Sequence, residues 1–501
     1  MSEDAVMNAS KQWCSVKALT VAVWALLMFS GCMVGPDYHS PQTPAPAAWV
    51  GVESLTGQPS EATAQPAELT QWWGQFNDPM LNKLVEEAVK TNLNLQIAET
   101  RLRQARALSG IAKGGLWPSV TASGSYQRQH MAGVTPDDQA QDLYLSGLDA
   151  VWELDLFGGV RRNIESANAN IQAAVENIRD VQVSIISEVA LDYVQLRGYQ
   201  KQIEVAKKNL EAQQHTAEIT RKLFNVGFSS ALDVANAESS VATTESQIPV
   251  FETSERQSIY ALSVLLARPP GDLLEKLSPA GNLPVAPAKI PAGLPSELLR
   301  RRPDIREAEA QLHAATAQIG VAVSQFFPAF SLTGAVNWNS NLLHTWFSNN
   351  NRSFSFGPSL NWPIFQGGAT VSNVRLQEAL RDQAFLTYQE TVLAAFQDVE
   401  NALIAVAKEQ EHRKSLNDAV AANRKAVDLS LLLYTEGQIA FLNVLVSQES
   451  LYASENALVQ SEGNIISDVI ALYKALGGGW EFAPTTVSPK QDFDNSNRKK
   501  E

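Results

Sequence analysis

The stretch NLQIAETRLRQARALSGIAKGGLWPSVTASGS, Asn94 to Ser125, has a counterpart further along the chain in DIREAEAQLHAATAQIGVAVSQFFPAFSLTGA, Asp304 to Ala335. The two stretches align without a gap at a constant shift of 210, the difference between 304 and 94. The matching residues include, in pairs, Ala98 and Ala308, Gly110 and Gly320, Pro118 and Pro328, Trp152 and Trp362, Gly227 and Gly437, and Leu266 and Leu476. Agreement at one shift over so much of the chain predicts that its body is a tandem duplication.

Within each copy the spacing of apolar residues changes from the helical to the extended type. From Leu84 to Ala112 apolar residues recur at intervals of three and four, which indicates one face of a helix. Beyond Pro118 the interval becomes two, and apolar residues alternate with polar ones. We expect strands over 116–128 and 144–157 in the first copy and over 326–338 and 354–365 in the second. A length of roughly 10 residues suits a tilted strand that crosses a bilayer.

The alternation has two interpretations, because a half-buried strand of a soluble β-sandwich shows the same pattern. Aromatic residues near the strand ends favour a membrane, where they form girdles at both interfaces; they are Tyr126, Trp152, Trp338 and Trp362. Four strands are too few for a barrel, since a spanning barrel needs at least about 8 and lipid tolerates no unpaired strand edge. Several chains must then share one barrel, and three chains of four strands would supply twelve.

A long helical pattern follows each strand pair. Residues 160–224 contain no proline, and their apolar residues form a narrow seam at intervals of three and four. Such a helix would extend on the order of 95 Å, beyond a compact domain, and an ordinary coiled-coil stalk is the alternative. We expect long helices over 160–224 and 369–434, turns over 225–230 and 435–440, and returning helices over 231–267 and 441–477.

The first turn carries the most specific local signals. In FNVGFSSALDVANAES, Phe224 to Ser239, Gly227 is placed to end a helix in the left-handed conformation. Ser230, with Asp233 three residues later, indicates a capping box that begins the next helix. The second turn keeps its glycine, Gly437. These residues predict two helix–turn–helix connections.

The N-terminal residues have the layout of a secretory signal. Two lysines precede an apolar run over 18–29, and small residues separate that run from Cys32. The run is too short for a spanning helix of about 20 residues, so residues 1–31 are predicted to be a signal peptide, whether translation starts at Met1 or at Met7. Small residues directly before a cysteine resemble the bacterial lipobox. That resemblance implies that Cys32 is acylated, with palmitate for example, and becomes the first residue of the mature chain.

Composition on both sides bounds the folded body. Residues 32–70 are rich in Pro, Ala, Thr, Ser and Gly, which suits an N-terminal tether behind the acylated cysteine. A polar tail follows over 483–501. The first repeat is therefore expected over 71–285 and the second over 286–482.

Charge and motif content exclude several functions. The chain has 53 acidic against 39 basic side chains and a net charge of −14, so nucleic acid is not expected as a partner. Its two cysteines, Cys14 and Cys32, both lie near the N-terminus, so the body offers no disulfide framework or cysteine metal site. The six histidines are scattered, and neither HExxH nor a P-loop is present. We therefore expect no enzyme, no metal and no cofactor other than the lipid on Cys32.

The order of helix, strand pair, long helix, turn and helix, repeated once behind a lipobox, resembles the TolC-like outer-membrane efflux proteins, in particular their NodT-type lipoprotein branch. The resemblance covers about residues 72–480 and includes the motifs WWGQFNDPMLNKLVEEAVKTN (Trp72 to Asn92), WELDLFGG (Trp152 to Gly159) and WPIFQGG (Trp362 to Gly368). It implies an α+β membrane protein. Three identical chains would build one twelve-stranded transmembrane β-barrel, continued by a periplasmic α-helical barrel.

The same resemblance implies a function and a location. The chain would be the outer-membrane channel of a tripartite efflux system, lipid-anchored and in contact with outer-membrane lipid. It would passively conduct substrates from an inner-membrane pump, of the proton-driven RND type, and a periplasmic adaptor. Loops over 130–142 and 339–352 would face the outside. Drug, metal and solvent exporters of this type share one architecture, so multidrug resistance is implied but the cargo stays open.

In that family the two turns meet the adaptor and constrict the closed channel. By resemblance, the adaptor-contacting residues are Val226, Gly227, Phe228, Ser229 and Gly437, with Phe228 in place of the family's leucine. At the constriction Tyr434 and Asp233 match the family, whereas its arginine is replaced by Ile439 and two of its aspartates by Asn443 and Val446. A charged gate would then need other residues, such as Glu436 or Asp233, or closure would rest on apolar packing.

A periplasmic adaptor or a structural coiled-coil lipoprotein is the alternative function. An adaptor also combines a lipoprotein leader with a helical hairpin. It would have one hairpin between β-rich domains, without duplication of the whole chain or paired aromatic strands.

Overall fold

The computed structural model describes residues 33–63, 69–130 and 140–482. The chain divides into two compact units, each assembled from three separate segments of the sequence. Unit 1 comprises residues 1–42, 101–174 and 307–388, and unit 2 comprises residues 43–100, 175–306 and 389–501. The predicted signal peptide, Cys32 and the tail over 483–501 lie outside the described residues.

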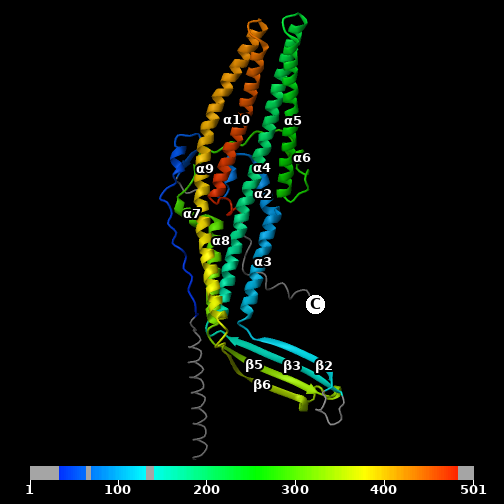
Figure 1. Ribbon diagram of the computed structural model, residues 1–501, viewed down its shortest axis with the longest axis vertical. Coiled ribbons are helices and arrows are strands. Elements are labelled where there is room, and N and C mark those ends of the chain that lie inside the picture. The colour runs from blue at the N-terminus through cyan, green and yellow to red at the C-terminus, as the bar shows by residue number, and fades with distance from the viewer. Residues whose placement is uncertain (1–32, 64–68, 131–139, 483–501) are drawn as a thin grey trace, which may run out of the picture. The chain divides into compact units, whose positions relative to one another are not determined.

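The described part of unit 1 contains a sheet of four antiparallel strands (Figure 1). Its strands are β2 (Ser119–Gln129), β3 (Gln141–Leu154), β5 (Ala329–Ser340) and β6 (Arg352–Asn361), side by side in that order. Pairing of β3 with β5 joins the first hairpin to the second. β2 and β6 are therefore the two edges of the sheet.

The strands begin and end at residues that differ from the predicted limits, because local hydrogen bonds set their ends. Phe326 and Phe327 donate their backbone N–H groups to carbonyls of the preceding helix and so continue it as turns. After β3, the Asp155 carboxylate accepts hydrogen bonds from two backbone N–H groups at the start of the next helix. After β6, Pro363 has no N–H group to contribute to a ladder.

Four helices have residues in both units, and they form two pairs of equal length. α3 (Leu93–Gly114) and α8 (Pro303–Ser324) have 22 residues each, and α4 (Gly159–Asn225) and α9 (Ala369–Thr435) have 67 each. In unit 1 the indole N–H of Trp152 donates to the carbonyl of Leu116, and that of Trp362 donates to the carbonyl of Phe326, both over 3.0 Å. These bonds tie each strand pair to the turn that links it to the preceding helix.

In unit 2 two further helices run back along the long ones (Figure 1). α5 (Ala231–Leu265) follows α4 and α10 (Phe441–Ala475) follows α9, and both have 35 residues. They end before the predicted 267 and 477 because Ala267 and Gly477 are left-handed, with φ of 56° and 67°. In both cases the next N–H group bonds back to the last turn, as in a Schellman motif. None of the helices in the described ranges is both long enough and apolar enough to span a membrane.

Short elements complete unit 2 around an aromatic core. They are the 3₁₀ helices η1 (Gly51–Leu55) and η2 (Trp72–Phe76), the helices α2 (Pro79–Thr91), α6 (Leu274–Leu277) and α7 (Pro295–Arg301), and the parallel strands β1 (Glu61–Thr63) and β4 (Lys289–Pro291). Trp72 is fully buried and stacks on Tyr473, with ring centres 5.1 Å apart. Asp78 begins α2 because its side chain accepts from two backbone N–H groups and Pro79 follows it.

Candidate functional site

One face of the unit 1 sheet is apolar and open. The pairing of the strands places Ala122 beside Leu148, Leu148 beside Val336 and Val336 beside Phe354, so apolar side chains cross all four strands. Phe354 and Phe356 are 68% and 83% exposed and border a hollow of about 480 Å³. The opposite face carries mostly Ser, Thr, Asn and Asp side chains. Soluble monomers rarely expose such a surface, which indicates contact with lipid or with protein.

Aromatic side chains gather at both ends of the sheet. At one end Tyr126, Tyr144, Trp338, Trp346 and Phe347 form neighbouring ring pairs with centres 5.0 to 6.0 Å apart. At the other end Trp152 and Trp362 make the indole hydrogen bonds described above. From Tyr144 to Trp152 along β3 is on the order of 27 Å, close to the ~25 Å apolar band of spanning barrels.

Sequence patterns missed three members of this aromatic group. Trp346 and Phe347 lie in the loop around η3 (Leu343–Thr345) and η4 (Asn349–Asn351), where no periodicity applies. Tyr144 begins the second predicted strand, and only the pairing of β2 with β3 shows that it lies opposite Tyr126. A count of aromatic residues within a few positions of each strand end was the available signal.

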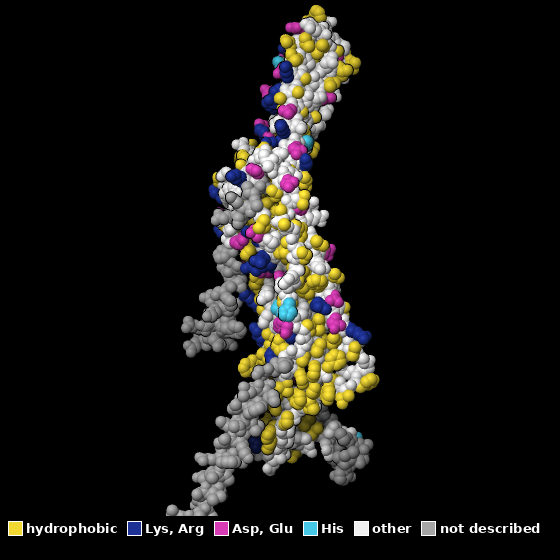
Figure 2. Space-filling model, turned by 90° about the vertical axis from the view of Figure 1, so that its left-hand side faces the viewer, with side chains coloured by type: hydrophobic (Ala, Val, Ile, Leu, Met, Phe, Trp, Pro, Cys, Tyr) yellow, Lys and Arg dark blue, Asp and Glu magenta, His cyan; other side chains and the backbone are white. Residues whose placement is uncertain are grey.

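The two turns of unit 2 have the same backbone construction. Gly227 and Gly437 are left-handed, with φ of 82° and 74°, as predicted for Gly227. The N–H groups of Phe228 and Gln438 bond back into the preceding helix over 2.8 and 2.9 Å. Val226 and Phe228 project from the first turn and are 65% and 83% exposed. Hydrophobic and uncharged polar side chains make up most of the surface at the top of Figure 2, where the turns lie.

The predicted capping box at the first turn is confirmed. The Ser230 hydroxyl accepts from the N–H of Asp233, and the Asp233 carboxylate accepts from the N–H of Ser230. Partial burial acts to raise the pKa of Asp233. Hydrogen bonds from Ser230 and from the Ser229 hydroxyl outweigh burial and lower that pKa, so the carboxylate stays charged at neutral pH.

Tyr434 joins the second turn to the first. Its hydroxyl lies 3.1 Å from the Ser229 hydroxyl, which also donates to Asp233. The Tyr434 ring is buried against Phe441 and Val444, and Ile439 packs around the same cluster. Tyr434 and Asp233 therefore belong to one hydrogen-bond network.

The remaining residues expected at the constriction are not part of that network. Glu436 is exposed and accepts a hydrogen bond from Gln438 over 2.7 Å. Asn443 and Val446 are also exposed on the first turns of α10. Ile439 supplies only apolar packing.

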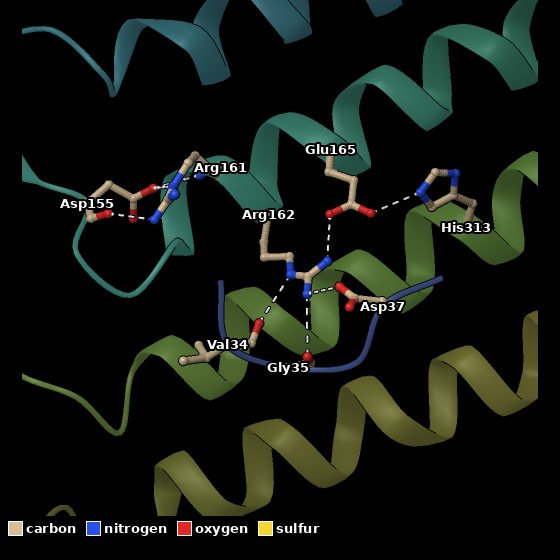
Figure 3. Close-up of polar contacts among 8 residues, drawn as sticks. All are labelled: Val34, Gly35, Asp37, Asp155, Arg161, Arg162, Glu165 and His313. Carbon is tan, nitrogen blue, oxygen red and sulfur yellow. Dashed lines mark hydrogen bonds and ion pairs between the residues drawn. The ribbon is translucent and has the colours of Figure 1, made fainter. Parts of the chain in front are cut away.

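Sequence patterns did not predict that the residues directly after Cys32 are held in place. Residues 33–40, here termed the N-terminal strap, lie against α4 and α8 within unit 1, as Figure 3 shows for their first part. The guanidinium of Arg162, which is 1% exposed, donates to the carbonyl of Val34 over 3.1 Å, to the carbonyl of Gly35 and to Asp37 over 2.6 Å. The N–H of Val34 donates to the carbonyl of Phe157.

Close packing and a second polar cluster complete the strap site. Gly35 is left-handed and lies so close to Gly320 that an added Cβ would come within 2.5 Å of the Gly320 Cα. Tyr38 stacks on His313 with ring centres 4.3 Å apart, and its hydroxyl donates to Glu309. Glu165 accepts from both Arg162 and His313, which lowers its pKa against the opposing effect of burial. The visible sequence signal was a glycine, Gly320, inside a helix.

A cavity of about 420 Å³ in unit 2 contains the other notable charged cluster. Its lining includes Asp180, Asp468 and Lys474 with the ion-paired Arg302 and Asp398. Burial, and then the nearby Glu409, raises the pKa of Asp468 to about 6. Acidic and basic side chains are mixed in this lining, so it presents no single sign to a ligand. Within the described ranges no group of three or more His, Cys, Asp or Glu side chains is arranged to hold a metal ion.

Comparison with known proteins gives consistent matches. The family model described as outer membrane efflux protein matches residues 84–268 and again residues 294–478, at the same shift that aligns the two halves of the sequence. The chain is 32% identical over 455 residues to Nodulation protein T of Rhizobium leguminosarum bv. trifolii, covering 91% of this chain and 96% of that protein. It is 32% identical over 468 residues to the solvent efflux pump outer membrane protein SrpC of Pseudomonas putida, covering 93% and 99%.

Solved structures show the same likeness. The outer-membrane channel OprN superimposes with a TM-score of 0.81 at 36% identity, covering 90% of this chain and all of that one. The open state of the MtrE outer membrane channel of Neisseria gonorrhoeae superimposes with a TM-score of 0.77 at 29% identity, covering 90% and 99%.

Proposed function

The chain belongs to the outer membrane efflux protein family, and we propose that three copies of it form one channel with a shared twelve-stranded barrel. The similar proteins are outer-membrane channels of efflux pumps and not enzymes. This chain is likewise an outer-membrane channel of an efflux system, with a helical extension into the periplasm. The assembly, the anchor and the roles of single residues are the proposed part.

The observation that carries the proposal is the open apolar face of a four-stranded sheet with two free edges. An unpaired edge cannot face lipid, because each of its N–H and C=O groups would lack a hydrogen-bond partner. Four strands cannot close on themselves, since spanning barrels have at least about 8. Three copies supply twelve, so each free edge meets an edge of another copy.

We also propose that the body arose by tandem duplication. The family model matches the chain twice, at the shift that aligns the two halves of the sequence. The helices of the two halves agree in length, at 22, 67 and 35 residues. Two tryptophans related by that same shift each make the same indole hydrogen bond. Duplication explains all three observations at once.

Acylation of Cys32 remains a proposal, and the strap supports it. Residue 33 directly follows the cysteine, and Val34 is bonded to Phe157 beside the start of α4. A lipid on Cys32 would therefore belong to unit 1, the unit that holds the proposed spanning sheet. Such an anchor would add membrane affinity to a chain whose proposed barrel already spans the membrane.

At the turns we propose contact with a periplasmic adaptor through Val226, Gly227, Phe228, Ser229 and Gly437. The exposed Val226 and Phe228 supply the apolar area that such an interface needs. We propose the constriction at Tyr434, Asp233, Glu436, Ile439, Asn443 and Val446, with closure by packing. The pump would be a proton-driven RND pump for multidrug resistance, in keeping with relatives named for solvent and antibiotic efflux.

Conductance of the purified protein in planar bilayers tests the function. A channel gives discrete conductance steps whose size is the same from one insertion to the next. A periplasmic adaptor or a coiled-coil lipoprotein gives none. Protein that is monomeric in detergent and produces no steps would refute both the assembly and the channel.

A further inference from the structure

We infer that the edge strand β6 of one copy pairs antiparallel with the edge strand β2 of the next copy, with Ser359 opposite Ser125. The inference rests on the proposed assembly and adds its residue-level register. It follows from the way in which the two hairpins of one copy already meet.

The constant shift between the two halves of the sequence holds through the strands without a slip. In the first hairpin Ser119 of β2 pairs with Val151 of β3. In the second hairpin Ala329 of β5 pairs with Asn361 of β6. Both residue numbers of the second pair are higher by 210, since 119 becomes 329 and 151 becomes 361. The hairpins therefore correspond residue for residue.

The junction between the two hairpins of one copy is a template for the junction between copies. Within one copy β3 meets β5 with Asp149 opposite Ala335. In a closed ring of equivalent hairpins, β6 occupies the position that corresponds to β3. The strand β2 of the next copy occupies the position that corresponds to β5. Adding 210 to 149 gives Ser359, and subtracting 210 from 335 gives Ser125. A ring in which each hairpin meets the next in one way requires these two residues to be partners.

The two faces of the strands agree with that register. Partners on antiparallel strands point to the same face, so a slip by one residue would set apolar side chains against polar ones. In the inferred register Gly124 lies opposite Leu360 on the apolar face. Ser123 lies opposite Asn361 on the polar face. Slips by an even number of residues, of which two is the smallest, keep the faces matched but break the repeat.

Both edges are open to a partner. Every residue of β2 except Gln129 is exposed, and every residue of β6 except Gly357 is exposed. The inner strands β3 and β5, which have a neighbour on each side, have a larger share of half-buried or buried residues. The edge residues thus lack the cover that a neighbouring strand gives. A second copy with the same edges would supply it.

Paired cysteines measure the register. Within one copy β2 and β6 are separated by two strands, roughly 14 Å, whereas a disulfide needs Cα atoms about 4.4–6.8 Å apart. A disulfide between Ser125→Cys and Ser359→Cys must therefore join two copies. The matched pairs Ser123→Cys with Ser359→Cys and Gln127→Cys with Ser359→Cys report slips by two residues in either direction. Each single-cysteine variant controls for linkage through the natural cysteines.

We expect covalent dimers and trimers on non-reducing gels of outer membranes from the Ser125 and Ser359 pair, at a yield on the order of tenfold above the two slipped pairs. A higher yield from either slipped pair, or equal yields from all three, would overturn the register. Absence of all cross-links in protein that is trimeric in detergent would also overturn it, while the assembly stands. Protein that neither cross-links nor forms trimers would remove the assembly and the inference together.

Discussion

At the scale of single residues, Arg162 decides whether the N-terminal strap stays in place. Its planar guanidinium donates to two carbonyls and two carboxylates at once, an arrangement that a lysine ammonium cannot reproduce. A lysine keeps the charge but loses most of these bonds, including those to the carbonyls of Val34 and Gly35, so Arg162→Lys should release the strap. The half-buried Tyr38 would then become open to chymotrypsin, with cleavage on the order of tenfold faster or more.

The neighbouring arginine is the matched control. Arg161 is paired with Asp155, beside the end of β3, so Arg161→Lys should leave cleavage after Tyr38 unchanged. Mass spectrometry of the released N-terminal peptide gives the rate. Equal acceleration in both variants would mean that general loosening of unit 1, and not the strap contact, exposes Tyr38.

Single residues also show why sequence patterns did not predict the strap site. The repeat pairs Gly110 with Gly320, yet the surroundings of the two glycines differ. An added Cβ at Gly110 meets nothing within 4 Å, whereas at Gly320 it would lie 2.7 Å from the Arg162 side chain. The difference arises because Gly320 and Arg162 both lie under the strap, which is far from Gly320 in sequence. Spacing within a helix carries no information about such a partner.

At the scale of elements, periodicity predicts the interior of each helix and strand but not its ends. The long helices, expected over 160–224 and 369–434, span Gly159–Asn225 and Ala369–Thr435. Strand ends differ by a few residues where a side-chain cap or a helical turn takes the backbone groups, as at Asp155 and Phe326. The alternation of apolar and polar residues predicts which face of a strand is apolar. It does not predict which hydrogen bonds the backbone groups at the strand ends will form.

The two faces of β6 give a prediction at this scale. Phe356 lies on the apolar face and Ser355 on the polar face, and both are exposed in one copy. Phe356→Arg would place a charge in lipid at about 2–4 kcal/mol per copy near the middle of the bilayer, so trimers in the outer membrane should fall sharply. Ser355→Arg, one residue away, should assemble normally. Immunoblots of unheated outer membranes measure the trimers, and equal loss in both variants would contradict a lipid-facing side.

At the scale of the whole molecule, the sequence predicts features of an assembly that a single chain does not display. The number of strands and the apolar face require other copies, yet each copy carries only half of every interface between copies. The repeat supplies the missing half, because the contact between hairpins inside a chain is a template for the contact between chains. Neither the sequence nor the structure indicates the cargo. A passive channel need not recognise a substrate that the pump has already selected.

In the proposed trimer, any residue at the proposed constriction would occur three times, which leads to the last prediction. Aspartates at two family positions are replaced here by Asn443 and Val446, so three copies form no carboxylate ring there. A trivalent cation such as hexamminecobalt on the periplasmic side should therefore block conductance weakly, because ion selection at a ring depends on its charge. Asn443→Asp restores three carboxylates and should lower the half-blocking concentration on the order of tenfold, about 1.4 kcal/mol. Strong block of the unaltered channel would mean that a carboxylate kept in the proposed constriction, Glu436 or Asp233, forms an acidic ring there.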